Sequence, residues 1–111
     1  MKRIVAITIL LLLVAGVAFA QQMKRGDFRA TVPAYNGNMT VTITVDRAGK
    51  ITRIAPTTHQ ETPVFANPVW QQMIPAMIQK QSWDVDIVAG STVTAEALKE
   101  AVKQAMALAR Q

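Results

Sequence analysis

The clearest pattern of hydrophobic and polar positions lies in residues 39–45, MTVTITV. Apolar residues alternate there with three threonines, and they are Met39, Val41, Ile43 and Val45. Because strand side chains point alternately to the two faces of a sheet, this pattern predicts a strand with one buried face and one hydroxyl-bearing face. Turn-forming residues lie on both sides, at 34–38 and 46–49. We therefore predict antiparallel partner strands over residues 28–32, ended by Pro33, and over residues 50–55.

The second half of the chain has mostly helical spacing. Apolar residues recur at helical intervals over 69–78, and Pro75 interrupts them, which predicts two short helices. Residues 95–110 are typical of an amphipathic helix, with a buried stripe of Leu98, Val102, Ala105 and Ala109. Residues 85–88 indicate a further short strand, and the three prolines of residues 56–68 favour an irregular loop. The fold class that we predict is α+β, a small antiparallel sheet with helices packed on one side.

The first twenty residues have the features of a secretory signal peptide. A basic start, Lys2 and Arg3, precedes an apolar run over residues 4–17 and the small-residue pattern Ala18-Phe19-Ala20. An uncleaved membrane anchor is the alternative, but the apolar stretch is shorter than the ~20 residues that span a bilayer. We therefore expect cleavage after Ala20 and a single domain over residues 21–111, exported to the periplasm, cell envelope or medium.

Charge and composition remove several classes of function. The full chain has a net charge of +5, and removal of residues 1–20 leaves ten basic and seven acidic residues. These basic residues are scattered and not interleaved with aromatic ones, which argues against nucleic-acid binding. The chain has no cysteine and one histidine, so neither thiol chemistry nor a histidine-based metal site is expected. A triad of Ser91, His59 and Asp86 is conceivable, but no nucleophile elbow surrounds the serine.

A cluster of hydroxyl groups precedes the last helix, in DIVAGSTVT at residues 86–94. In one interpretation it is a turn in which Gly90 bends the chain, Thr94 caps the helix and Glu96 complements the helix dipole. In the other, Thr92 lies about two residues before the first helical turn. A phosphate on its hydroxyl would then lie among free backbone N–H groups at the positive end of the helix.

The same stretch resembles the flavinylation motif of the FMN-binding domain family, Asp-x-x-Ser/Thr-Gly-Ala-Thr, followed by x-Ser/Thr before a helix. Asp86, Gly90, Thr92 and Thr94 match this pattern, whereas Ala89 replaces the Ser/Thr and Ser91 replaces the alanine. The resemblance extends over most of residues 26–108. It includes the hairpin from Asn36, the sequence HQETP at residues 59–63, and IPAMIQKQSWDVD at residues 74–86.

This resemblance implies a covalent flavoprotein that transfers electrons. The family occurs in sodium-pumping NADH:quinone reductase, in Rnf complexes and in exported flavoproteins. By resemblance, Thr92 forms a phosphoester with FMN, which a magnesium-dependent flavin transferase takes from FAD after export. Further cofactor-binding residues implied by the motifs are Asp86, Gly90, Ser91, Thr94, Glu61, Thr62 and His59. Asp86 is expected to orient the loop or to help the metal of the transferase.

The expected partners are an electron donor and an electron acceptor protein, for example a membrane redox complex. The resemblance favours an electron carrier or accessory subunit over a stand-alone enzyme. The alternative is a flavin-free binding module of the cell envelope with the same fold, which the departures at Ala89 and Ser91 favour. His59 is equally explained as a structural loop residue. Trp70 suits the core, and Trp83 suits either the core or stacking on the flavin ring.

Overall fold

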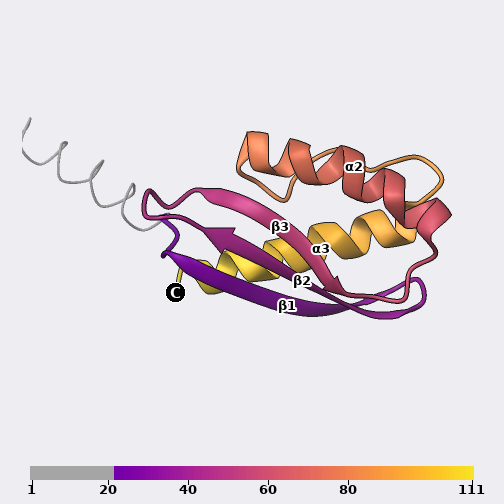
Figure 1. Cartoon of the computed structure of the whole chain (residues 1–111), viewed down its shortest axis with the longest axis horizontal. Coiled ribbons are helices and arrows are strands. Elements are labelled where there is room, and N and C mark those ends of the chain that lie inside the picture. Colours follow the sequence, from indigo (N-terminus) through magenta and orange to yellow (C-terminus); the bar gives the residue numbers. More distant parts are fainter. Residues whose placement is uncertain (1–21) are drawn as a thin grey trace, which may run out of the picture.

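The computed structural model describes residues 22–111 as a three-stranded sheet and two helices (Figure 1). In chain order these are β1 (Gly26–Ala34), β2 (Gly37–Val45), β3 (Ile51–Thr58), α2 (Pro63–Lys80) and α3 (Thr92–Ala109). The strands are antiparallel in the order β1-β2-β3, and both helices lie on one side of the sheet. The predicted α+β class is therefore confirmed. The predicted signal peptide lies outside the described residues.

The alternating pattern of β2 sets the buried face of the sheet. Its four apolar side chains, at positions 39, 41, 43 and 45, are at most 2% exposed. The hairpin before it pairs Ala34 with Gly37 across a two-residue turn, Tyr35 and Asn36. Gly37 has a φ of 102°, which L side chains rarely adopt, and this explains the glycine at that point. The predicted strand and its turns are confirmed.

Strand β1 is longer than its sequence predicts, because Pro33 does not end it. Pro33 lies within β1 and is paired with Asn38 of β2. β1 is at the edge of the sheet, where a residue without a backbone N–H is tolerated because no neighbouring strand needs that donor. The prediction that proline would end the strand is therefore wrong.

Helix α2 is one continuous helix rather than the two short helices predicted. Pro68 and Pro75 lie inside it, and each removes one hydrogen bond to the carbonyl four residues earlier. Those carbonyls belong to Val64 and Gln71, which are both exposed, so water can replace the lost bonds. The opposite face is buried, with Ala66, Val69, Met73 and Met77. Burial of this face explains why the helix continues past both prolines.

The connection from α2 to α3 begins at Gln81, which has a left-handed backbone (φ 57°) and closes the end of α2. Its side chain bonds both backbone groups of Ile51, accepting from the N–H at 2.7 Å and donating to the carbonyl at 2.9 Å. This attaches the end of α2 to the start of β3. The chain then returns alongside α2, and residues 85–88 form no strand, contrary to the prediction. No neighbouring strand is there to pair with them.

Helix α3 begins at Thr92, three residues earlier than predicted, and packs across β1 and β2. The predicted stripe of Leu98, Val102, Ala105 and Ala109 is buried, as expected. Alanines form much of this face, and their small size lets the helix lie close to the sheet. Because the helix begins early, Glu96 is its fifth residue and lies beyond the first turn, so its predicted interaction with the helix dipole is wrong.

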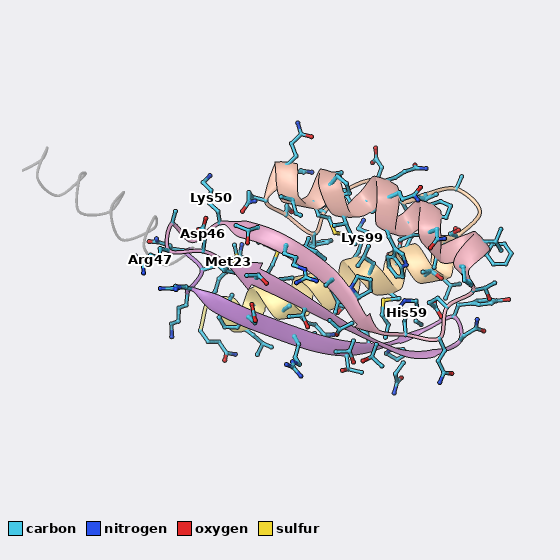
Figure 2. All side chains as sticks on the ribbon, in the orientation of Figure 1. Met23, Asp46, Arg47, Lys50, His59 and Lys99 are labelled. Atoms are coloured by element: carbon cyan, nitrogen blue, oxygen red, sulfur yellow. The ribbon has the colours of Figure 1, made fainter. Side chains whose placement is uncertain are left out.

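The two ends of the sheet differ in what they carry. The β1–β2 turn, the β3–α2 connection and the start of α3 lie at one end, close to His59 in Figure 2. Asp46, Arg47 and Lys50 lie at the other end, in the β2–β3 turn. Within residues 22–111, neither helix has the length and apolar character needed to cross a membrane.

The packing of α3 on the sheet predicts where substitutions destabilise the protein. Leu98 is fully buried, so Leu98→Ala should lower the free energy of unfolding by about 2–5 kcal/mol, because it removes apolar contacts and leaves a cavity. Leu108 in the same helix is 42% exposed, and Leu108→Ala should change it by less than about 0.5 kcal/mol. Urea unfolding measures both, and equal effects would contradict the burial of this face.

Candidate functional site

A pocket of about 380 Å³ lies at the N-terminal end of α3. Three separate parts of the chain form it: the β1–β2 turn, the first turn of α2, and the residues that lead into α3. Its lining residues are Tyr35, Phe65, Gly90, Ser91, Thr92, Val93 and Thr94. Large side chains on its rim face solvent, since Tyr35 is 63%, Phe65 49% and Val93 53% exposed. The pocket is thus open, with apolar and aromatic side chains around a helix terminus.

Gly90 makes the bend that brings the chain to this helix terminus. Its φ is +86°, and a Cβ atom placed there would meet no atom within 4 Å. The glycine is therefore needed for its backbone conformation rather than for space. This agrees with the turn that the sequence predicts at this residue.

Ser91 and Thr92 differ in what their hydroxyl groups do. Ser91 is the N-cap residue of α3, but its hydroxyl donates to the backbone carbonyl of Phe65 at 2.7 Å and does not cap the helix. The hydroxyl of Thr92, the first helical residue, makes no hydrogen bond within residues 22–111. Of these two neighbouring residues, Thr92 is therefore the one whose hydroxyl is free.

The first turn of α3 is left without a side-chain cap. Ala95 donates its backbone N–H to the carbonyl of Ser91. The N–H groups of Thr92, Val93 and Thr94 have no acceptor in the described part of the chain. Three free donors at the positive end of an 18-residue helix form a site suited to an anionic group.

Thr94 does not cap the helix, contrary to one interpretation of the sequence. It is the third residue of α3, it is 4% exposed, and its hydroxyl donates to Oε1 of Glu61 at 2.8 Å. Glu61 also accepts the backbone N–H of Tyr35 at 3.1 Å and that of Asn36 at 2.8 Å. This buried carboxylate therefore joins the β1–β2 turn, the β3–α2 connection and the start of α3.

These bonds decide the ionisation of Glu61. Burial by itself raises the pKa of its carboxyl group. Hydrogen bonds from Asn36, Thr94 and Tyr35 outweigh burial and hold the pKa below the ordinary value of 4.5. Interaction with the charge of His59 adds in the same direction. The group is therefore an anion at neutral pH, and both of its oxygens are occupied by donors of the protein.

Thr62 and His59 have structural partners as well. Thr62 is the N-cap residue of α2, its carbonyl accepts the N–H groups of Phe65 and Ala66, and its hydroxyl accepts from the side-chain amide of Asn36. Nδ1 of His59 accepts the backbone N–H of Glu61 at 3.2 Å. Neither residue lines the pocket beside Thr92. Their predicted contact with the flavin ring stays a prediction.

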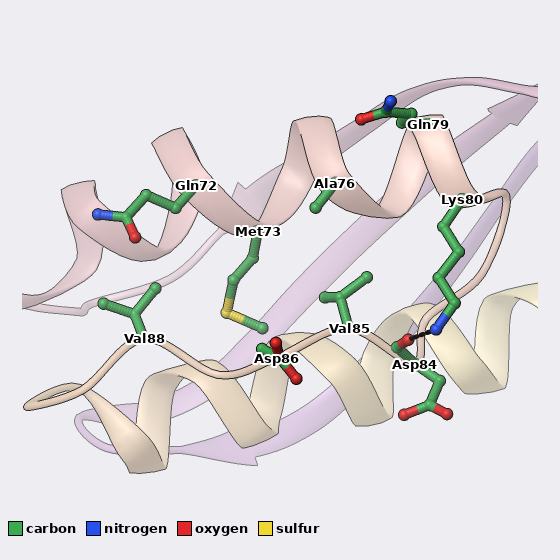
Figure 3. A pocket seen from close by; sticks show the side chains of 9 residues that line it. All are labelled: Gln72, Met73, Ala76, Gln79, Lys80, Asp84, Val85, Asp86 and Val88. Carbon is green, nitrogen blue, oxygen red and sulfur yellow. Dashed lines mark hydrogen bonds between the residues drawn. The ribbon is translucent and has the colours of Figure 1, made fainter.

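Asp86 lies apart from this pocket. It lines a second pocket of about 580 Å³ between α2 and the returning chain, together with Met73, Val85 and Val88 (Figure 3). Asp86 has no ion pair or hydrogen bond within the described residues. No hydrogen bond there joins Ser91, His59 and Asp86, so the structure does not assemble a hydrolase triad.

The two tryptophans lie outside the pocket as well. Trp70 packs partly buried against the core, with its ring edge-on to His59 at 5.3 Å between centroids. Trp83 also packs against the core, and the ammonium groups of Lys99 and Lys103 lie 5.7 and 5.1 Å from its ring centroid. The interpretation of Trp70 as a core residue is confirmed. The position of Trp83 favours packing over stacking in this pocket.

Three lining residues were missed by the sequence argument. Tyr35 was assigned only to a turn, whereas Phe65 and Val93 were assigned no role. The signal that could have identified them is the unusual position of each large apolar side chain. Tyr35 lies in a turn, Phe65 lies two residues after Pro63, and Val93 lies between two threonines of the hydroxyl cluster. In the described residues, no cluster of three His, Cys, Asp or Glu side chains suits a metal ion.

Comparison with known proteins identifies the family. The sequence pattern of the FMN-binding domain matches residues 34–107, about two thirds of the chain. The chain belongs to the FMN-binding domain family. It is 29% identical over 83 residues to an uncharacterized protein of Treponema pallidum (strain Nichols), covering 75% of this chain and 23% of that protein.

A second relative is an oxidoreductase. The chain is 29% identical over 88 residues to the NADH:acrylate oxidoreductase of Vibrio harveyi, covering 79% of this chain and 9% of that protein. The chain thus spans less than a quarter of the length of either relative. The family resemblance drawn from the sequence motifs is confirmed.

The pocket at α3 fits the two chemical parts of FMN, a phosphate and a flat aromatic ring. Free N–H groups of the first helical turn suit the phosphate. Exposed Tyr35 and Phe65 on the rim suit a flat ring, which can stack on aromatic side chains. The residues present are therefore compatible with FMN at this position.

The anchoring role of Glu61 yields a pH-dependent prediction. Glu61→Gln should lower the free energy of unfolding at pH 7 by about 1–3 kcal/mol, because an amide cannot accept from all three donors. A lowered pKa means that the stabilisation is present above pH 4.5 and is lost as the pH falls through the folded-state pKa. The difference between the two proteins should therefore shrink as the solution is acidified.

Denaturant unfolding from pH 7 to pH 3 measures this difference. Glu96→Gln is the matched control, because Glu96 is exposed on α3 and makes no bond in the described part of the chain. It should leave stability nearly unchanged at every pH. A constant difference between wild type and Glu61→Gln at all pH values would contradict the anionic anchor.

Proposed function

We propose that this protein is an exported electron carrier that holds FMN through a phosphoester on Thr92. The observation that carries the proposal is the free hydroxyl of Thr92 at the uncapped start of α3, inside a pocket with an aromatic rim. Family membership supports FMN as the cofactor. We infer the covalent bond from the motif around Thr92 and the export from the N-terminal sequence.

The bonding of the two neighbouring hydroxyls supports attachment at Thr92 rather than at Ser91. The Ser91 hydroxyl already donates to the carbonyl of Phe65, and its use as a nucleophile would break that bond. Thr92 has no such bond to lose. Thr92 is also the first helical residue, so a phosphate on its oxygen would lie near the free N–H groups of the first turn, which supports attachment there.

The attachment step is a phosphoryl transfer from FAD. The hydroxyl oxygen of Thr92 forms a bond to the phosphorus of the FMN half of FAD, and the bond from that phosphorus to the bridging oxygen breaks. AMP leaves with the bridging oxygen, and the hydroxyl proton passes to a base or to water. The phosphodiester that results has one negative charge. The N-terminus of α3 stabilises such a charge by about 0.3–1 kcal/mol at an exposed position.

Bound FMN supplies one- and two-electron transfer. The chain contributes position and environment. Tyr35 and Phe65 flank the pocket and would shield a bound ring from water, while the open rim would leave part of it accessible to a partner protein. Glu61 keeps the turn that bears Tyr35 fixed relative to the start of α3.

The relatives support a carrier within a larger redox system. One relative is named NADH:acrylate oxidoreductase, and this chain corresponds to 9% of its length. We propose that this domain relays electrons between a donor and an acceptor protein, such as a membrane redox complex, while other proteins act on the substrates. A flavin transferase is the partner required for loading. The flavin-free binding module stays the alternative that the first experiment excludes or supports.

Intact mass of the protein coexpressed with an exported flavin transferase tests covalent loading and export together. The expected mass is that of residues 21–111 plus one FMN unit, and Thr92→Ala should have the bare mass. Ser91→Ala is the matched control and should keep the FMN unit, because it removes the neighbouring hydroxyl only. If Ser91→Ala lost the FMN unit and Thr92→Ala kept it, the attachment residue would be Ser91 instead of Thr92. If the wild-type protein had the mass without FMN while the same transferase loaded a control substrate, the result would support the flavin-free binding module.

Asp86 provides a second test of loading. Asp86→Ala should abolish the covalent FMN while leaving thermal unfolding unchanged, because the side chain is exposed and makes no bond within residues 22–111. Glu96→Ala removes an exposed carboxylate from α3 and should be loaded like the wild type. In-gel flavin fluorescence and mass measure the result. Normal loading of Asp86→Ala would rule out a role for this carboxylate.

A further inference from the structure

Residues 85–88 run beside α2 without belonging to a helix or strand, Ala89 follows them in a turn, and the backbone of this segment has almost no partner (Figure 3). The N–H groups of Asp86, Ile87, Val88 and Ala89 donate to nothing in the described chain. The carbonyls of residues 85–87 likewise accept nothing there. Consecutive residues of a strand direct their backbone groups to opposite edges, so four free donors and three free acceptors leave both edges of this segment unpaired, and another strand can add to either one.

The sequence of this segment also favours a strand. Three of its five residues are β-branched, and the pattern predicts a strand over 85–88 that the fold leaves unpaired. Val85 and Val88 pack partly buried against the core and hold the segment in place. Ile87 is 38% exposed. The segment is therefore held against the core and accessible, so pairing with a partner strand would cost little entropy of ordering.

Space for such a strand exists beside the segment. The pocket of about 580 Å³ runs between residues 84–88 and α2, as Figure 3 shows. Met73 points into it from the helix, and Gln72, Ala76 and Gln79 of α2 also line it. The unpaired carboxylate of Asp86 lies on the same groove. Lys80 and Asp84 line the groove as well, but Lys80 already donates to the carbonyl of Asp84, and Asp84 is paired with Lys99. The unpaired charge of the groove is thus that of Asp86, and an extended peptide with a basic side chain opposite it would match this charge.

The position in the chain indicates which protein supplies the strand. The segment ends three residues before Thr92, with only Gly90 and Ser91 between them. An enzyme that modifies the Thr92 hydroxyl has to cover this part of the surface. We propose that residues 85–89 are the docking strand for the flavin transferase, which places an extended segment of its own in the groove and pairs with them. The proposal rests on the proposed function, because it names how the loading enzyme is recognised.

Amide hydrogen exchange of the exported, unloaded protein tests the pairing directly. The Thr92→Val variant keeps the shape of the side chain but removes the reacting oxygen, so its complex with the transferase does not turn over. In the complex, alternate amides of the segment should slow by at least about ten-fold, either Ile87 and Ala89 or Asp86 and Val88, because a strand bonds one edge through every second residue. The remaining pair should change much less.

Three results would overturn the proposal. Uniform slowing of all four amides would mean that the segment is covered without strand pairing. No slowing in a complex that forms would place the docking surface elsewhere. Slowing of the same amides in FMN-loaded protein without the transferase would mean that the cofactor fills the groove. A wild type that an active transferase does not load would instead contradict the proposed function, which keeps the two failures distinct.

A pair of proline variants supplies an independent readout. Ile87→Pro and Val88→Pro each remove one N–H donor, and these two donors belong to opposite edges of the segment. Only the proline that replaces a residue with a protected amide should lower the loading rate, by about ten-fold for one lost hydrogen bond. Ile87→Thr keeps the N–H and the β-branched shape and should be loaded at nearly the wild-type rate. Thermal unfolding checks that each variant is folded. Equal loading of both proline variants would contradict strand pairing.

Discussion

The buried carboxylate of Glu61 is the constraint on which the site depends. It is 5% exposed, and its two oxygens accept hydrogen bonds from the β1–β2 turn and from Thr94 at the start of α3. A charged group in the interior is stable only when such donors replace its water. Satisfying Glu61 therefore fixes three separate parts of the chain relative to one another, and the pocket beside Thr92 is the space that remains between them.

A second consequence concerns the start of α3. Helices usually satisfy their first N–H groups with a side-chain cap. Here the Ser91 hydroxyl bonds the carbonyl of Phe65, and the Thr94 hydroxyl bonds Glu61. Both bonds strengthen the tertiary structure while leaving the helix terminus uncapped. The missing cap costs some helix stability, but it leaves the first N–H groups of α3 free to bind an anionic group. This is what is expected of a binding site.

The return of the chain along α2 links the site to the surface around it. Residues 85–89 are held by Val85 and Val88 but have unpaired backbone groups, and they lead through Gly90 to the helix terminus. Asp86 and Thr92, which the motif places six residues apart, therefore line two different pockets. One pocket suits the cofactor, and the other suits the recognition of the motif by a partner.

Local patterns in the sequence were enough to predict several parts of the fold. Alternation in β2, glycines at turns and the stripe of α3 predicted the sheet, its hairpin and the buried helical face, and the motif around Thr92 identified the family. Tertiary structure decided the rest. Burial of one face carried α2 past Pro68 and Pro75, the edge position let Pro33 stay within β1, and the lack of a neighbouring strand left residues 85–88 unpaired. Tertiary contacts also set the roles of Glu61, Ser91 and Thr94. Each of these side chains bonds a partner 26 to 33 residues away, and sequence spacing does not reveal such a partner.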